Sequence, residues 1–132
     1  IVQVLNNLLS NAIKFTNPGG YVSTAASICN GDNPTKSSGR GISPHWFGSE
    51  TESKSGKSLI LEVFNSGSEI TNENLPYLFD KFKQFEAAAK SSKKGTGLGL
   101  AIVRGIVEEH GGIVGVASGG GGTSFLCKIP IA

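Results

Sequence analysis

Hydrophobic and polar positions recur with two different periods along this 132-residue chain, and the changes of period divide it into segments. Residues 1–15 repeat apolar side chains with the period of about 3.6 residues that an α-helix requires. The apolar side is broad, and three polar residues share one direction on the other side, namely Asn7, Asn11 and Lys14. The pattern predicts an amphipathic helix over residues 1–15.

Segments typical of β-strands follow. The turn signal Asn17–Gly20 separates the first helix from a strand predicted over residues 21–28. Residues 58–64, with the sequence SLILEVF, form a near-continuous apolar run, which favours a central strand. Residues 113–117 and 123–129 are two more predicted strands, and the glycine-rich turn between them predicts a hairpin.

Two further helices are predicted from apolar spacing. Thr71 is the expected N-cap of the first, and Pro76 is expected to interrupt its first turn, because proline lacks a backbone N–H. The second covers residues 98–110 and ends at the glycines after His110. Gly105 weakens it by about 1 kcal/mol relative to alanine, so close packing is its expected compensation. The expected core residues are Leu75, Leu78, Phe79, Phe82 and Phe85 in the first helix and Leu98, Ile102, Ile106 and Val107 in the second.

Residues 29–57 differ in composition from the rest of the chain. They are rich in Ser, Gly, Asn, Lys and Glu and show no apolar period, which predicts a long flexible loop between two strands. Trp46 and Phe47 are the apolar exception, and one anchoring contact with the core is favoured over contact with a partner. His45 has no second metal ligand nearby and is expected at the surface.

Composition narrows the possible classes. The chain has 12 Lys and Arg residues and 10 Asp and Glu residues, a formal net charge of +2. A charge this small does not indicate nucleic-acid binding. Cys29 and Cys127 lie in no metal-ligand spacing, so both are expected to stay reduced in an intracellular protein. No apolar run approaches the roughly 20 residues of a membrane span. Ile1 is not a natural start, so the chain is expected to be part of a longer protein.

Two polar features carry the candidate chemistry. Asn7 and Asn11 stand one helical turn apart, where their amide oxygens suit Mg²⁺, and Lys14 could reach a phosphate. In residues 94–100, three glycines at every second position run into a helix, and the free N–H groups of such a turn suit a phosphate. Each feature has a plain alternative: a polar surface satisfied by water, or a tight connection.

In this order, the segments resemble the ATP-binding catalytic domain of sensor histidine kinases, of the GHKL superfamily. Residues 3–16 are similar to the N box of that family, residues 78–82 to its F box and residues 95–100 to its G2 box. The ending over residues 111–130 also resembles the family. The resemblance covers nearly the whole chain except residues 29–57.

The resemblance implies a fold, ligands and a site. The fold would be an α/β (α+β) two-layer sandwich of Bergerat type, with a mixed sheet and helices on one face. Residues 1–132 would form one ATP-binding domain with a flexible insertion at about 29–57. The ligands would be ATP and Mg²⁺, with Asn7 and Asn11 holding the metal. The other implied cofactor-binding residues are Lys14, Asn65, Gly67, Ile70, Phe82, Lys94, Gly95, Thr96, Gly97, Leu98, Gly99, Leu100 and Thr123.

One box departs from the family pattern. The G1 box of the family reads Asp-x-Gly-x-Gly-Ile, whereas residues 65–70 read Asn-Ser-Gly-Ser-Glu-Ile. The resemblance implies that the first position accepts a hydrogen bond from the adenine amino group. Asn65 retains an acceptor oxygen but lacks the charge of aspartate, and Glu69 adds bulk and negative charge near the nucleotide.

The function implied is transfer of the γ-phosphoryl group of ATP to a histidine on a separate dimerisation domain of the same parent protein. A response-regulator receiver domain would act downstream in two-component signalling. Neither His45 nor His110 has the surroundings of an acceptor, so the chain alone is expected to be inactive, and no catalytic residue is assigned.

Two alternatives remain open. Asn65 and Glu69 would also fit a degenerate nucleotide-binding or scaffolding module with weak or no kinase activity. Another GHKL member, such as an ATPase clamp or an anti-sigma-type Ser/Thr kinase, is less favoured by the N and G2 boxes. The expected location is the cytoplasmic side, without nucleic-acid or direct membrane contact, and the parent protein could be a membrane-bound receptor.

Overall fold

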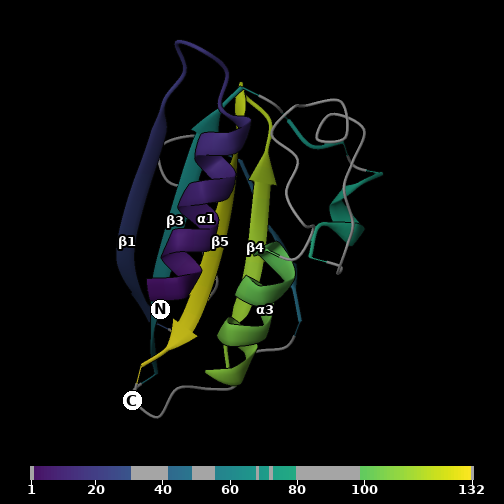
Figure 1. Cartoon of the computed structure of the whole chain (residues 1–132). Helices are drawn as coiled ribbons and strands as arrows, with labels where there is room; N and C mark the ends of the chain where they lie inside the picture. Colours follow the sequence, from purple (N-terminus) through teal and green to yellow (C-terminus); the bar gives the residue numbers. More distant parts are fainter. Residues whose placement is uncertain are drawn as a thin grey trace.

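The computed structural model describes residues 2–30, 42–48, 56–67, 69–71, 73–79 and 99–131. The described elements are, in chain order, α1 (Val2–Phe15), β1 (Val22–Asn30), β2 (His45–Phe47), β3 (Lys57–Ser66), the short 3₁₀ helix η1 (Leu75–Tyr77), α3 (Gly99–Glu109), β4 (Ile113–Ser118) and β5 (Gly122–Pro130). The strands form one 5-stranded sheet in the order β1-β3-β5-β4-β2. Helices α1 and α3 contact each other and lie on the same face of this sheet (Figure 1).

The predicted two-layer α/β sandwich is confirmed, but the described strands pair antiparallel throughout, so this sheet is not mixed. Strands β3 and β4 run in the same direction, since both are antiparallel to β5. They do not pair with each other because the tight β4–β5 hairpin places β5 between them. The crossover through α3 therefore joins two parallel strands without producing a parallel ladder.

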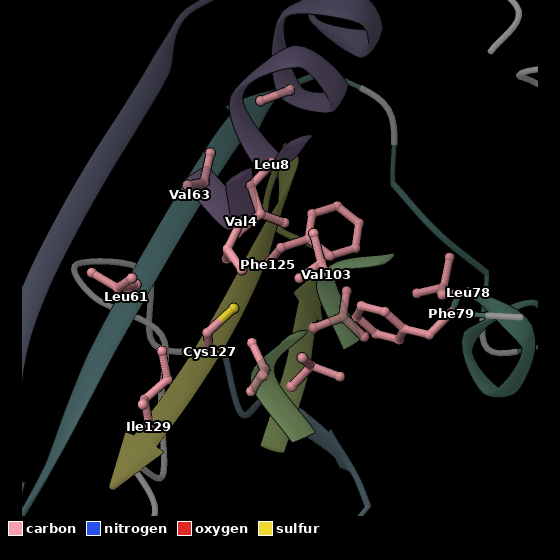
Figure 2. Close-up of a cluster of buried hydrophobic side chains, with 14 residues drawn as sticks. Val4, Leu8, Leu61, Val63, Leu78, Phe79, Val103, Phe125, Cys127 and Ile129 are labelled. Atoms are coloured by element: carbon pink, nitrogen blue, oxygen red, sulfur yellow. The ribbon is translucent and has the colours of Figure 1, made fainter. Parts of the chain in front are cut away.

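The main core lies between the helices and the sheet (Figure 2). Buried side chains at every fourth position form one row on each helix, because such residues share a helix face. They pack against alternate residues of the inner strands. The helix rows are Val4, Leu8 and Ala12 on α1 and Val103 and Val107 on α3; the strand residues are Leu61, Val63, Val114, Val116, Phe125, Cys127 and Ile129.

Both cysteines are free thiols, as predicted. Cys29 is half-buried on the edge strand β1, and Cys127 lies in the core. Burial raises the pKa of the Cys127 thiol to about 12, because the low-dielectric interior disfavours the thiolate. Cys127 is therefore neutral at physiological pH and fills space as a small apolar side chain.

The predicted core side of α3 is confirmed at Val107 and Ile106, but Val103 was missed and Ile102 is wrong. Val103 and Val107 are fully buried, whereas Ile102 is 39% exposed, and Leu98 lies outside the described residues. The apolar stripe of α3 is broad, so its sequence does not reveal which residues lie at the centre. Contact with both α1 and β4 sets that centre at Val103 and Val107.

Gly105 is exposed, which contradicts the expectation of close packing. A Cβ built on Gly105 meets none of the described atoms within 4 Å. We expect Gly105→Ala to raise the free energy of unfolding by about 0.5–1 kcal/mol, because alanine loses less backbone entropy in a helix. Urea unfolding of the two proteins measures this difference. A loss of stability in the alanine variant would contradict the open surroundings of this helix position.

The segment after Ile70 is a turn and not a capped α-helix. The carbonyl oxygen of Thr71 accepts hydrogen bonds from the N–H groups of Asn74 and Leu75, at 3.0 and 3.2 Å. Pro76 then lies in the first turn of η1, so the predicted interruption at this proline is confirmed. Of the expected apolar stripe, Leu78 and Phe79 are buried and Leu75 is half-buried, while Phe82 and Phe85 lie outside the described residues.

Residues 45–47 correct the prediction of a loop over residues 29–57. They form β2, which pairs with β4 at the sheet edge opposite β1. Because β1 and β3 are neighbours, the chain reaches the far edge to form β2 and returns before β3 begins. A strand of 3 residues is too short to show alternation in the sequence.

Both apolar side chains of β2 anchor it, on opposite faces of the sheet. Trp46 lies over Gly115, where a Cβ would come within 2.7 Å of its indole ring. Phe47 packs against the core on the helix side. The predicted anchoring contact is therefore confirmed, and there are two such contacts, one on each face of the sheet. His45 is exposed, as expected. The residues grouped with Trp46 on the other face are Ile60, Ala117, Leu126, Cys29 and Ile42.

Candidate functional site

The predicted adenine-binding residues meet where β3 ends and β5 begins. Asn65 and Thr123 are direct partners in the β3–β5 ladder and are 3% and 2% exposed. Each lies two residues along its strand from a core residue, Val63 or Phe125, so both occupy the face that carries the helices. Asn65 Nδ2 donates a hydrogen bond to the Ser66 carbonyl oxygen at 3.3 Å. The amide oxygen is then the acceptor that Asn65 can offer to a ligand.

Gly67 joins three parts of the chain at this end of the sheet. It forms an isolated antiparallel bridge with Thr16, which follows α1, and its N–H donates to the Gly121 carbonyl oxygen at 2.9 Å. Its φ of +111° favours glycine, and a Cβ would lie 3.0 Å from Asn17 Nδ2. The glycine is therefore needed to hold the end of α1, the end of β3 and the β4–β5 turn together.

Ile70 is held to the same end of the sheet by a side chain that sequence reasoning missed. The Ile70 N–H donates to Ser118 Oγ at 2.6 Å, and Ser118 Oγ lies 3.0 Å from Thr123 Oγ1 within hydrogen-bond distance. Ser118 is the partner of Thr123 in the β4–β5 ladder. The hairpin pattern could have suggested this pairing, but the bond to Ile70 depends on the tertiary fold.

Glu69, the other departure in the G1 box, makes a structural contact. Its Oε2 accepts a hydrogen bond from the Gly121 N–H at 2.9 Å. Gly121 has a φ of +93° in the exposed β4–β5 turn, where its N–H is not part of the strand ladder. The carboxylate expected near the nucleotide is thus bound to the hairpin turn, and its bulk is accommodated there.

The polar side of α1 is partly enclosed. Asn7, Asn11 and Lys14 are half-buried, whereas Asn6 on the same helix is exposed. The Nδ2 atom of Asn7 is buried and has no hydrogen-bond partner among the described residues. A buried N–H donor without an acceptor costs stability, so this position fits a ligand with acceptor oxygens, such as a phosphate. Two amide oxygens and one ammonium group match a hard cation beside phosphates.

The predicted phosphate-binding turn is described only at its end. Gly99 begins α3, and Leu100 packs against the core. The first turn of α3 offers backbone N–H groups and the positive end of the helix dipole, on the same sheet face as α1. The predicted residues Phe82, Lys94, Gly95, Thr96, Gly97 and Leu98 lie outside the described residues.

Within the described parts of the chain, no three His, Cys, Asp or Glu side chains gather as a metal site. The amide oxygens of Asn7 and Asn11 suit Mg²⁺ better than a transition metal. The helices of these parts are also too short or too polar to cross a membrane.

The sandwich is similar to that of histidine kinase catalytic domains. The nucleotide-free catalytic domain of histidine kinase ThkA is similar with a TM-score of 0.64 and 29% identity, over 97% of this chain and 64% of that chain. The mycobacterial sensor histidine kinase MprB is similar with a TM-score of 0.62 and 25% identity, over 97% of this chain and 70% of that chain.

Sequence comparison agrees with the structural likeness. The family of histidine kinase-, DNA gyrase B- and HSP90-like ATPases matches residues 1–132, and the chain belongs to this family. Sensor protein SrrB of Staphylococcus aureus (strain NCTC 8325 / PS 47) is 37% identical over 129 residues. That match covers 97% of this chain and 18% of SrrB, so the chain spans less than a fifth of its relative. The resemblance to a GHKL histidine kinase ATP-binding domain is confirmed.

Proposed function

We propose that this chain binds Mg·ATP and, within its parent protein, donates the γ-phosphoryl group to a histidine on a separate dimerisation domain. The observation that carries the proposal is the half-buried polar side of α1 in a histidine-kinase-type sandwich, where Asn7 Nδ2 has no acceptor among the described residues. Residues 1–132 would form the ATP-binding domain, and residues 29–57 an insertion in it.

The proposed roles follow from the chemistry of each side chain. The amide oxygens of Asn7 and Asn11 would hold Mg²⁺, and the Lys14 ammonium would bind a phosphate. The metal, when bound, supplies charge neutralisation at the phosphates. Asn65 would accept a hydrogen bond from the adenine amino group, and Thr123 beside it would fix the position of the base. The protein mainly positions the nucleotide, so no general base is required in this chain.

A partner follows from a related structure. ThkA in complex with response regulator protein TrrA is similar to this chain with a TM-score of 0.62 and 26% identity, over 98% of this chain and 28% of that chain. This supports a response-regulator receiver domain as the downstream partner. We place the domain on the cytoplasmic side and expect it to be inactive without the acceptor histidine.

The competing proposal is a degenerate module that keeps the fold without useful nucleotide affinity. The substitution at Asn65 favours it, because a neutral acceptor is weaker than aspartate. The contact of Glu69 with the Gly121 N–H weakens it, because the added charge already has a partner.

Calorimetry on the 132-residue chain tests the proposal. We expect micromolar ATP binding with Mg²⁺ and at least about 100-fold weaker binding after the metal is removed with EDTA, because the Asn7 and Asn11 oxygens bind phosphate through the cation. Asn65→Ala should weaken ATP binding by about tenfold through loss of one hydrogen bond. It should affect GTP less, because GTP lacks the adenine amino group. No binding by the folded wild-type chain would favour the degenerate module.

A further inference from the structure

Three aromatic rings form a continuous row from the sheet edge to its centre. Phe47 on β2 and Phe79 have ring centroids 5.1 Å apart with an interplanar angle of 64°, and Phe79 and Phe125 on β5 are 6.2 Å apart at 89°. Both are edge-to-face contacts, which aromatic rings favour. Phe79 and Phe125 are each 4% exposed, and Phe47 packs against the same core cluster.

The row connects β2 with the proposed nucleotide site. Phe125 lies two residues after Thr123 on the same face of β5, and its ladder partner Val63 lies two residues before Asn65. Phe79 is the last of the described residues 73–79, which follow Asn65 and Ile70 along the chain and include η1. Phe79 therefore has the strand of the site on one side and the ring of Phe47 on the other.

Strand β2 has few other means of staying in place. It has 3 residues and pairs only with β4 among the described strands. The few backbone hydrogen bonds of such a short edge strand stabilise it only slightly. Its side chains must therefore supply much of the free energy that holds it on the sheet. Trp46 occupies the space above Gly115 on one face, and Phe47 meets Phe79 on the other.

We propose that Phe47 is a positioning residue for the nucleotide site. Its ring holds Phe79 against Phe125, and this fixes residues 73–79 against β5, the strand that carries Thr123. Docking of β2 and nucleotide binding are then coupled, and the coupling is reciprocal: each stabilises the other. The inference rests on the proposed function, since ATP is the ligand that reports it. It assigns a role to β2, which lies in the part of the chain that the kinase resemblance does not cover.

Calorimetry on the whole chain with Mg·ATP tests the proposal first. Phe47→Ala should weaken ATP binding by about tenfold, and Phe47→Leu should restore it to within about threefold, because leucine still contacts the Phe79 ring. The stability control is Ile129→Ala, which truncates a buried residue of the same core near the other end of β5. This control should lose stability and keep its ATP affinity.

Trp46 provides a second readout. It is the only tryptophan of the chain and lies on β2 next to Phe47. In the wild type, Mg·ATP should reduce the quenching of its fluorescence by acrylamide. The ATP concentration at the midpoint of this change should agree with the dissociation constant measured by calorimetry. In Phe47→Ala this change should disappear.

The outcomes separate the two proposals. If the wild type binds Mg·ATP, but Phe47→Ala binds equally well and Trp46 does not respond, the coupling is wrong and the proposed function stands. Equal losses of affinity in Phe47→Ala and Ile129→Ala would also overturn the coupling, since general destabilisation would explain both. A folded wild type that binds no nucleotide would overturn both proposals.

Discussion

Asn11→Ala is expected to weaken Mg²⁺-dependent ATP binding by about 100-fold. The reason is that the variant loses an oxygen ligand of a hard cation, and alanine offers no replacement. Asn11 is half-buried on the enclosed side of α1, one turn from Asn7, so a water molecule in its place would be less well positioned. Calorimetry at several Mg²⁺ concentrations measures the effect.

Asn6→Ala is the matched control for this experiment. Asn6 lies on the same helix and undergoes the same chemical change, but its side chain is exposed. Alanine is the better helix former, so both variants should be at least as stable as the wild type. Equal ATP affinities in Asn11→Ala and Asn6→Ala would contradict the metal-binding role of Asn11.

Gly122→Ala is expected to lower the free energy of unfolding by about 3 kcal/mol, at the upper end of the range for overpacked sites. Its Cβ would meet the carbonyl oxygen of Asn65 and lie 2.5 Å from two atoms of the Phe64 ring. The strand cannot move away easily, because Gly122 is the ladder partner of Ser66 at the start of β5. Any shift also displaces Asn65, so ATP affinity should fall as well.

Gly105→Ala is the matched control for Gly122→Ala, since it adds the same methyl group in open surroundings. Urea unfolding should show opposite signs for the two variants, with Gly122→Ala less stable and Gly105→Ala more stable than the wild type. A stability loss below about 1 kcal/mol in Gly122→Ala would mean that the start of β5 can relax, against the overpacking assumed here.

The hydrogen bonds of Glu69 and Ser118 hold the variant G1 box against the β4–β5 hairpin. Both attach the chain after β3 to the β4–β5 hairpin: Glu69 through the N–H of Gly121, and Ser118 through the N–H of Ile70. Together with the bond from Gly67 to Gly121, they fix the turn that follows Asn65. The departure from the family pattern thus lies in a turn that is well anchored.

Elements whose signals are local could be predicted from the sequence. Helix α1 ends at Phe15 as predicted, because apolar periodicity and the turn after it are properties of neighbouring residues. The helix end at Gly111 and the β4–β5 hairpin were likewise predicted from local glycines, and these glycines have positive φ in the structure. The family boxes also identified Asn65 and Thr123, which the structure places side by side.

The surfaces that meet could not be predicted from local sequence. The insertion of β5 between β3 and β4, the burial of Val103 instead of Ile102, and the pairing of β2 at the far edge all depend on contacts between residues distant in the chain. The contact of Phe47 with Phe79 and that of Ser118 with Ile70 arise in the same way. Local sequence sets the period and ends of an element, but the free energy of burial sets its partners, and that depends on the whole fold.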